Sequence, residues 1–102
     1  MHARITSVRF QPGAADEATS IYRDIMLPAA SEQQGFRSAL AFRSNSQPEK
    51  YIIISLWETE ADMLASRPPE DILPLLQPLE KLVAESNQDT YEMLFQIDGK
   101  SQ

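Results

Sequence analysis

The strongest strand signal in the chain is Tyr51-Ile52-Ile53-Ile54-Ser55-Leu56-Trp57. β-Branched and aromatic residues favour an extended backbone, and this stretch is apolar at nearly every position. A strand with one wet face alternates apolar and polar residues, whereas a continuous apolar run indicates that both faces are covered. Helices of the same chain can cover one face. The other face needs a second layer, which 102 residues cannot readily supply.

Successive side chains of a strand point to opposite faces of its sheet. If the helices lie over Trp57, the odd-numbered residues from Tyr51 onward face them. Ile52, Ile54 and Leu56 then face the second layer. A second copy of the chain is the most direct source of this layer for so short a protein.

The residues upstream predict a strand, a helix and another strand. Residues 3–10 are rich in β-branched side chains and end at the turn signal Gln11-Pro12-Gly13. From residue 14, apolar residues recur at steps of three and four, which predicts an amphipathic helix. Pro28 has no backbone N–H and should kink or end regular helix near residue 27. Residues 36–43 predict the second strand.

The residues downstream predict helices and a last strand. Thr59 is the expected N-cap of a short helix over 60–66. An apolar stripe predicts a further helix over 72–84, interrupted by prolines, and residues 90–97 predict a fourth strand. The resulting order is that of an α+β, ferredoxin-like β-α-β-β-α-β fold, with a four-stranded antiparallel sheet and helices on one face. Two such sheets packed face to face through a two-fold axis would form a homodimer.

Composition limits the classes of function. Formal net charge is −6 and the pI is near 4.6, which disfavours binding to nucleic acid and to anionic membranes. The chain has no cysteine, so disulfides and thiolate chemistry are excluded. No signal core or membrane-spanning stretch is evident, and the cytoplasm is the expected compartment. We expect one domain over residues 1–97 and a flexible tail over 98–102.

Five short landmarks have the spacing of a known family: Gln11-Pro12-Gly13, Pro28, Gly35-Phe36, Ser55-Leu56-Trp57-Glu58-Thr59 and Tyr91-Glu92-Met93-Leu94. Together they resemble the antibiotic biosynthesis monooxygenase (ABM) domain family of the dimeric α/β barrel superfamily, over nearly the whole chain. The resemblance implies two ferredoxin-like subunits that form a dimeric α/β barrel, with a pocket between sheet and helices. Members include cofactor-independent quinone-forming monooxygenases, haem-degrading monooxygenases and small proteins of no assigned activity.

The haem-degrading branch of that superfamily is a poor match. Its pattern has an Asn on the first strand, a Trp ending the third and an iron-ligating His on the later helix. This chain has Trp57, but Thr6 or a neighbour occupies the first position, and the predicted helix over 72–84 has no His. Without an axial ligand this mode of haem binding loses its anchor, so we expect no cofactor. The single histidine, His2, is expected at a frayed terminus, and no metal-ligand spacing is present.

The resemblance implies three candidate catalytic residues. Trp57 would line the pocket and offer its indole N–H to a substrate oxygen, although a Trp at a strand end is also ordinary core packing. Tyr22 lies one position off the helical stripe, so its ring borders the pocket or covers the helix surface. Thr6 shares the helix-facing parity of the first strand, where a half-buried Thr is also common without a function.

Two functions remain open from the residues. One is a small cofactor-independent monooxygenase that binds an aromatic phenol or hydroquinone, whose anion passes an electron to dioxygen. The alternative is a non-catalytic dimeric protein of the same fold that binds a small ligand or responds to stress. Polar groups that converge on Trp57 in a roomy cavity favour the first, whereas Leu75, Leu79 and Phe10 filling that space favour the second.

Overall fold

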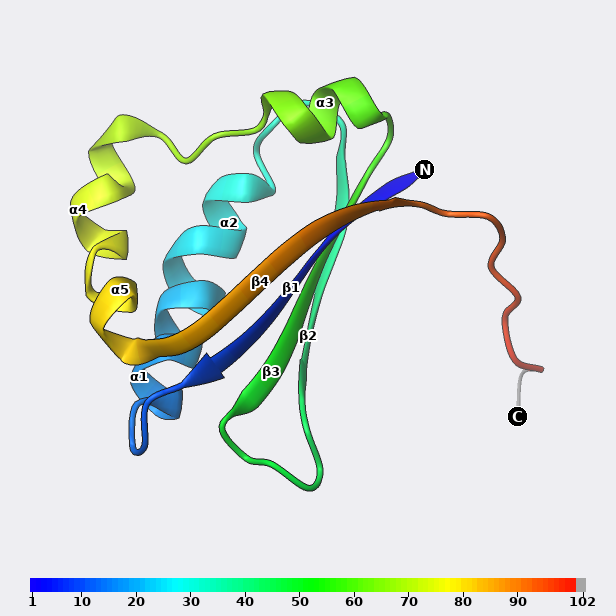
Figure 1. Cartoon of the computed structure of the whole chain (residues 1–102). Coiled ribbons are helices and arrows are strands. Elements are labelled where there is room, and N and C mark those ends of the chain that lie inside the picture. Colours follow the sequence, from blue (N-terminus) through cyan, green and yellow to red (C-terminus); the bar gives the residue numbers. More distant parts are fainter. Residues whose placement is uncertain (101–102) are drawn as a thin grey trace.

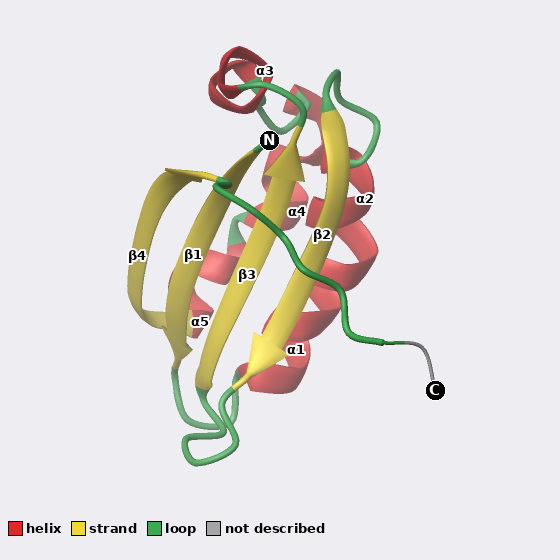
Figure 2. Ribbon diagram, turned by 90° about the vertical axis from the view of Figure 1, so that its right-hand side faces the viewer, coloured by secondary structure: helices red, strands yellow, loops and turns green. Residues whose placement is uncertain are grey.

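The computed structural model describes residues 1–100 and contains one antiparallel sheet with its helices packed on one side (Figure 1). Strand order is β2-β3-β1-β4, which confirms the predicted ferredoxin-like topology. Figure 2 shows the sheet from its other side, which no helix covers. The strands are β1 (His2–Phe10), β2 (Phe36–Arg43), β3 (Lys50–Trp57) and β4 (Val83–Glu92).

The first helical segment continues past Pro28, the residue that was expected to kink or end it. It consists of α1 (Ala15–Ile21), a π-helical turn η1 (Tyr22–Met26) and α2 (Leu27–Ala30). In the π turn the N–H of Leu27 bonds to the carbonyl of Tyr22, five residues back. This wider turn comes immediately before Pro28, whose ring would clash with a carbonyl of a regular helix. Regular α-helix is therefore interrupted just before Pro28, which is one of the two expected outcomes, but the helix does not end near residue 27.

The second helical segment is interrupted at its prolines, as predicted, and it ends at Leu82, two residues earlier than expected. It consists of α3 (Glu60–Ala65), a 3₁₀ turn η2 (Glu70–Ile72), α4 (Leu73–Leu76) and α5 (Pro78–Leu82). The predicted N-cap is confirmed, because the Thr59 hydroxyl accepts a hydrogen bond from the backbone N–H of Asp62 at 3.0 Å.

The fourth strand begins seven residues earlier than the sequence pattern indicated. Val83 is already extended, so the apolar stripe that predicted helix over 72–84 runs on into β4. β4 pairs with β1 along its length, from Ser86 opposite Val8 to Glu92 opposite His2. It is an edge strand with mostly polar, exposed residues, and such a strand carries little hydrophobic signal. The predicted strand over 90–97 therefore overlaps the observed strand only at residues 90–92, and its predicted position was wrong.

The inner face of the sheet forms the core with the helices. The expected alternation along β3 is confirmed, because Ile53 and Trp57 are 7% and 1% exposed whereas Ile52 is 38% exposed. Val8 and Phe10 of β1 join the same buried layer. The outer face carries apolar side chains open to water, with Leu40, Phe42 and Ile52 among them.

The amino terminus is held in the sheet. His2, expected at a frayed end, is the first residue of β1 and pairs with Trp57 on one side and Glu92 on the other. The carbonyl of Met1 also accepts a hydrogen bond from the N–H of Met93 at 2.8 Å. The prediction of fraying was wrong because β1 is flanked by a strand on both sides, and both pairings reach His2.

The segment from residue 93 to residue 100 has neither helix nor strand. It leaves the end of β4 on the helix-free side of the sheet (Figures 1 and 2), and Leu94, Phe95 and Ile97 are largely exposed. The predicted flexible tail over 98–102 lies partly outside the described residues, and the domain boundary at residue 97 stays a prediction. Within residues 1–100, no helix combines the length and apolarity needed to cross a lipid bilayer.

Gly35 and Gly13 provide a matched test of the fold. Both have positive φ, of +82° and +79°, but a Cβ on Gly35 would lie 2.5 Å from the Cβ of Asp62, whereas Gly13 faces open space. We expect Gly13→Ala to lower the free energy of unfolding by about 1 kcal/mol and Gly35→Ala by about 3 kcal/mol. Urea denaturation measures both. Equal losses would show that the approach of α3 to Gly35 is not constraining.

Candidate functional site

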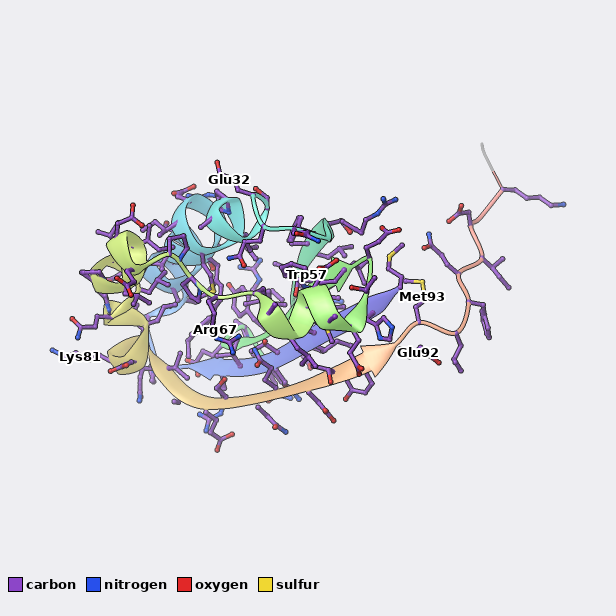
Figure 3. All side chains as sticks on the ribbon, turned by 90° about the horizontal axis from the view of Figure 1, so that it is seen from above. Glu32, Trp57, Arg67, Lys81, Glu92 and Met93 are labelled. Carbon is purple, nitrogen blue, oxygen red and sulfur yellow. The ribbon has the colours of Figure 1, made fainter. Side chains whose placement is uncertain are left out.

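A cavity of about 350 Å³ lies between the inner face of the sheet and the helical layer. It brings together the three residues predicted from the sequence, because Thr6, Tyr22 and Trp57 all line it. Strands β1, β3 and β4 supply one wall, and η1, α2 and the segment after α3 supply the other. Figure 3 shows Trp57 and Arg67 in the space between strands and helices.

Trp57 forms a buried, fully bonded part of the wall. Its indole N–H donates to the hydroxyl oxygen of Ser55 at 2.9 Å, and its ring meets that of Phe36 edge-on at 5.4 Å. Direct donation from the indole to a substrate, as the sequence suggested, would require that bond to break. The Ser55 hydroxyl, which also lines the cavity, retains its own hydrogen for a ligand.

Thr6 is paired with a residue that the sequence did not single out. Gln88 lies directly opposite it on β4, and its side-chain amide donates to the Thr6 hydroxyl oxygen at 3.0 Å. The Thr6 hydroxyl is thereby left to act as a donor toward the cavity. Gln88 was missed because the fourth strand was predicted to begin at residue 90.

Tyr22 opens the π-helical turn and borders the same cavity. Burial raises the pKa of its phenol, so the hydroxyl stays protonated and is a hydrogen-bond donor near neutral pH. Within residues 1–100 this hydroxyl has no hydrogen-bond partner in the protein, which leaves it available to a ligand. Single π turns inside helices are rare and occur often at functional sites.

Tyr22, Leu27 and Ile53 also separate the first cavity from a second one. The second has a volume of about 520 Å³ and lies between the first helical segment and strands β2 and β3. Its lining is largely apolar, with Phe10 and Tyr51 at one end in ring contact at 5.1 Å. The first cavity is therefore the one that combines apolar walls with many polar groups.

Two arginines line the first cavity, and neither was predicted. Arg4, on β1, donates to the Ser66 hydroxyl at 3.0 Å and to the Met63 carbonyl at 2.7 Å. Arg67, in the segment after α3, donates to the carbonyls of Leu64 and Ser66 at 2.9 and 2.8 Å. Burial, and then the positive charge of Arg67, lowers the pKa of the Arg4 guanidinium. Arg4 shares the inward parity of Thr6, a signal that could have identified it.

The three residues whose packing into this space would have favoured a non-catalytic protein lie elsewhere. Phe10 and Leu79 belong to the buried core cluster, and Leu75 is 53% exposed; none of the three lines the cavity around Trp57. His2 does not line it either. Among residues 1–100, no three His, Cys, Asp or Glu side chains gather closely enough to hold a metal ion.

A family model described as "Antibiotic biosynthesis monooxygenase" matches residues 1–71 of the chain. No curated protein sequence matches significantly. Among solved structures, similarity extends to SnoaB, a cofactor-independent oxygenase from Streptomyces nogalater, with a TM-score of 0.81 and 16% identity over 96% of this chain and 97% of that one.

Two further solved structures have the same fold. A Nitrosomonas europaea protein provisionally named an antibiotic biosynthesis monooxygenase has a TM-score of 0.80 and 14% identity, over 93% of this chain and 100% of that one. PA3566 from Pseudomonas aeruginosa has a TM-score of 0.75 and 17% identity, over 92% and 94%. At these identities the likeness establishes the fold and transfers no residue role.

The bond between Trp57 and Ser55 generates a stability prediction. Ser55→Ala leaves the indole N–H without its acceptor, so we expect the free energy of unfolding to fall by about 1–2 kcal/mol. Ser38→Ala is the control, because Ser38 lies on the outer face and its hydroxyl makes no hydrogen bond within residues 1–100; its effect should stay below about 0.5 kcal/mol. Equal effects in urea denaturation would contradict a structural role for the bond.

Proposed function

Because this chain belongs to the antibiotic biosynthesis monooxygenase family, we propose that it is a monooxygenase that oxidises an electron-rich phenol or hydroquinone without a cofactor. The observation that carries the proposal is the cavity itself. Its apolar wall, which includes Ile53 and Trp57, suits an aromatic ring, and hydroxyl donors of Thr6 and Tyr22 border the same space. Such donors can stabilise the negative charge of a phenolate oxygen.

The proposed reaction balances without a second reductant. A phenol that loses its hydroxyl hydrogen and one ring hydrogen gives up four electrons to dioxygen. One oxygen atom becomes a new carbonyl oxygen of the quinone, and the other leaves as water with the two hydrogens. A 1,4-hydroquinone loses both hydroxyl hydrogens and one ring hydrogen; two leave as water, and the third stays on the inserted oxygen as the hydroxyl of a 2-hydroxyquinone. A phenol with an electron-rich ring is needed because its anion must transfer the first electron directly to dioxygen.

We assign the site roles as follows. Tyr22 donates its phenolic hydrogen to the substrate oxygen, since burial keeps that hydroxyl protonated. Thr6 donates a second hydrogen bond, while Gln88 holds its oxygen. Trp57 provides the apolar wall and fixes the Ser55 hydroxyl beside it. The hydroxyls of Tyr22, Thr6 and Ser55 are the donors toward the ligand, and hydrogen bonds to its oxygen favour the charged form of a bound phenol.

A second candidate function is non-catalytic binding of a small ligand. It is favoured by one observation: among the described residues that line the cavity, none is a His, Asp or Glu, the usual general bases. Substrate would then have to enter as its anion or lose its proton to water. Turnover distinguishes the two functions directly.

Oxygen uptake with dihydroxynaphthalenes tests the proposal. We expect consumption of one dioxygen per quinone formed, no hydrogen peroxide, and one atom of ¹⁸O from ¹⁸O₂ in the product. Tyr22→Phe should lower kcat/KM by about 100-fold, because it removes a donor to the developing oxyanion. Tyr91→Phe, which changes an exposed tyrosine on the outer face, should have no effect. Peroxide in place of oxygen insertion, or the absence of uptake, would exclude the monooxygenase.

We also propose that two copies pack their sheets together as a homodimer. The outer face has no helix over it, and Leu40, Phe42 and Ile52 on it are 41%, 51% and 38% exposed. Ile54 and Leu56 lie on the same face between them, so the apolar area is continuous across β2 and β3. A self-complementary contact about a two-fold axis buries this area in both copies at once.

Light scattering after size exclusion tests this assembly. Leu40→Asp places a charge on the outer face, and we expect it to convert the dimer to a monomer at micromolar concentration because a buried carboxylate would lack a partner. Leu75→Asp makes the same change on the helical side, at a leucine that is 53% exposed, and should leave the dimer intact. A wild-type protein that elutes as a monomer would contradict the proposal.

A further inference from the structure

Two positively charged groups lie in one cavity with no negative charge to balance them. Arg4 and Arg67 both line the space beside Trp57, and none of its lining residues is an Asp or Glu. The chain as a whole has 15 acidic and 9 basic residues, so a purely cationic lining runs against its composition. Burial, and after it the neighbouring positive charge of Arg67, lowers the pKa of Arg4.

The hydrogen bonds of both arginines go to neutral acceptors. Arg4 bonds to a hydroxyl and a carbonyl, and Arg67 bonds to two backbone carbonyls. Arg67 is exposed and Arg4 is half-buried, yet neither contacts an acidic side chain, whereas Arg9, Arg23 and Arg37 each do. Neutral partners orient the two cavity guanidiniums without neutralising them.

The backbone of Arg67 is held by two hydrogen bonds with Gln33, which lies in the loop after α2. The side-chain amide of Gln33 accepts from the backbone N–H of Arg67 at 3.0 Å and donates to the carbonyl of the same residue. The side-chain amide of Gln33 thus bonds to both backbone polar groups of Arg67, as a neighbouring strand would. It links the segment after α3 to the loop after α2. A side chain needed only for solubility would not require its backbone to be fixed in this way.

We propose that Arg4 and Arg67 bind a carboxylate group on a planar aromatic ligand, whose ring packs against the apolar wall that includes Ile53 and Trp57. The proposal rests on the proposed function, because it places the ligand in the same cavity. A guanidinium has five N–H donors in a planar fork that matches a carboxylate. Arg4 uses two of its five N–H donors within the protein. Arg67 uses both N–H donors of its Nη1, so the donors on its Nε and Nη2 remain available to a ligand.

Charge makes this recognition selective as well as attractive. The net charge of −6 repels anions from most of the surface, so an anionic ligand gains from a site where two cations stand together. An uncharged ligand of the same shape would pack against the apolar wall equally well, but it would leave both guanidiniums without a counter-charge. The arginines therefore set the substrate class, whereas Thr6 and Tyr22 face its ring oxygens.

Isothermal titration calorimetry with 2-naphthoate and 2-naphthamide tests this inference. The two probes have the same ring and differ in charge, and neither reacts with oxygen. We expect the wild-type protein to bind 2-naphthoate about 10-fold more tightly, and added salt to weaken only that ligand. Equal affinities, or binding of neither probe, would overturn the proposal.

Matched variants assign the preference to the two arginines. Arg67→Gln should reduce the preference to about threefold, and the Arg4→Gln/Arg67→Gln double variant should abolish it. Arg43→Gln removes the same charge from an exposed strand end outside the cavity and should retain it. Arg4→Lys is the variant that keeps the positive charge. Thermal unfolding checks that the variants are folded. A preference that survives in the folded double variant would overturn the assignment.

Oxygen uptake separates this inference from the proposed function. If 1,4-dihydroxy-2-naphthoate is bound with the arginine-dependent preference but consumes no oxygen, the carboxylate site stands and the monooxygenase falls. If 1,4-dihydroxynaphthalene is oxidised as well as its carboxylated analogue, and Arg67→Gln changes neither rate, the monooxygenase stands and the carboxylate site falls.

Discussion

The register of β1 between its two neighbours is the constraint on which the rest of the structure depends. β1 is hydrogen-bonded to β3 on one side and β4 on the other, so these two pairings determine which side chains of three strands face the helices. In this register Arg4, Thr6 and Val8 share the inner face with Ile53 and Gln88. A slip of one residue would turn Arg4 and Thr6 outward and break the core at the same time. Stability and the cavity are therefore set by the same hydrogen bonds.

The parts of the fold that could be predicted are those in which burial and periodicity agree. β2 and β3 matched their predicted bounds closely because each has a strong apolar or β-branched pattern with turn residues at its ends. β4 did not, because an exposed edge strand is polar and its start continues the stripe of the preceding helix. The π turn was also beyond periodicity, since it depends on how the backbone adjusts before Pro28.

The resemblance to the family placed the pocket, and the alternation of side chains along the strands then selected Thr6 and Trp57; residues whose position depends on contacts with distant segments were missed. Thr6, Tyr22 and Trp57 were expected near one pocket, and they do line one cavity. Gln88 could not be placed without the correct start of β4. Arg67 lies in an irregular segment between two helices, where no periodicity applies, and its backbone is bonded to Gln33, 34 residues earlier in the chain. Contacts between distant segments decide these positions, and a local pattern contains no information about them.

The burial of Trp57 has an optical consequence. It is the only tryptophan of the chain, it is 1% exposed, and it forms part of the cavity wall. A shielded indole emits at shorter wavelength than one in water, and its emission responds to charges and rings that come close to it. The protein therefore carries its own fluorophore beside the space that a ligand would occupy. Binding of a ligand in the cavity can therefore be followed by the fluorescence of Trp57 without a label, and no second tryptophan contributes to that emission.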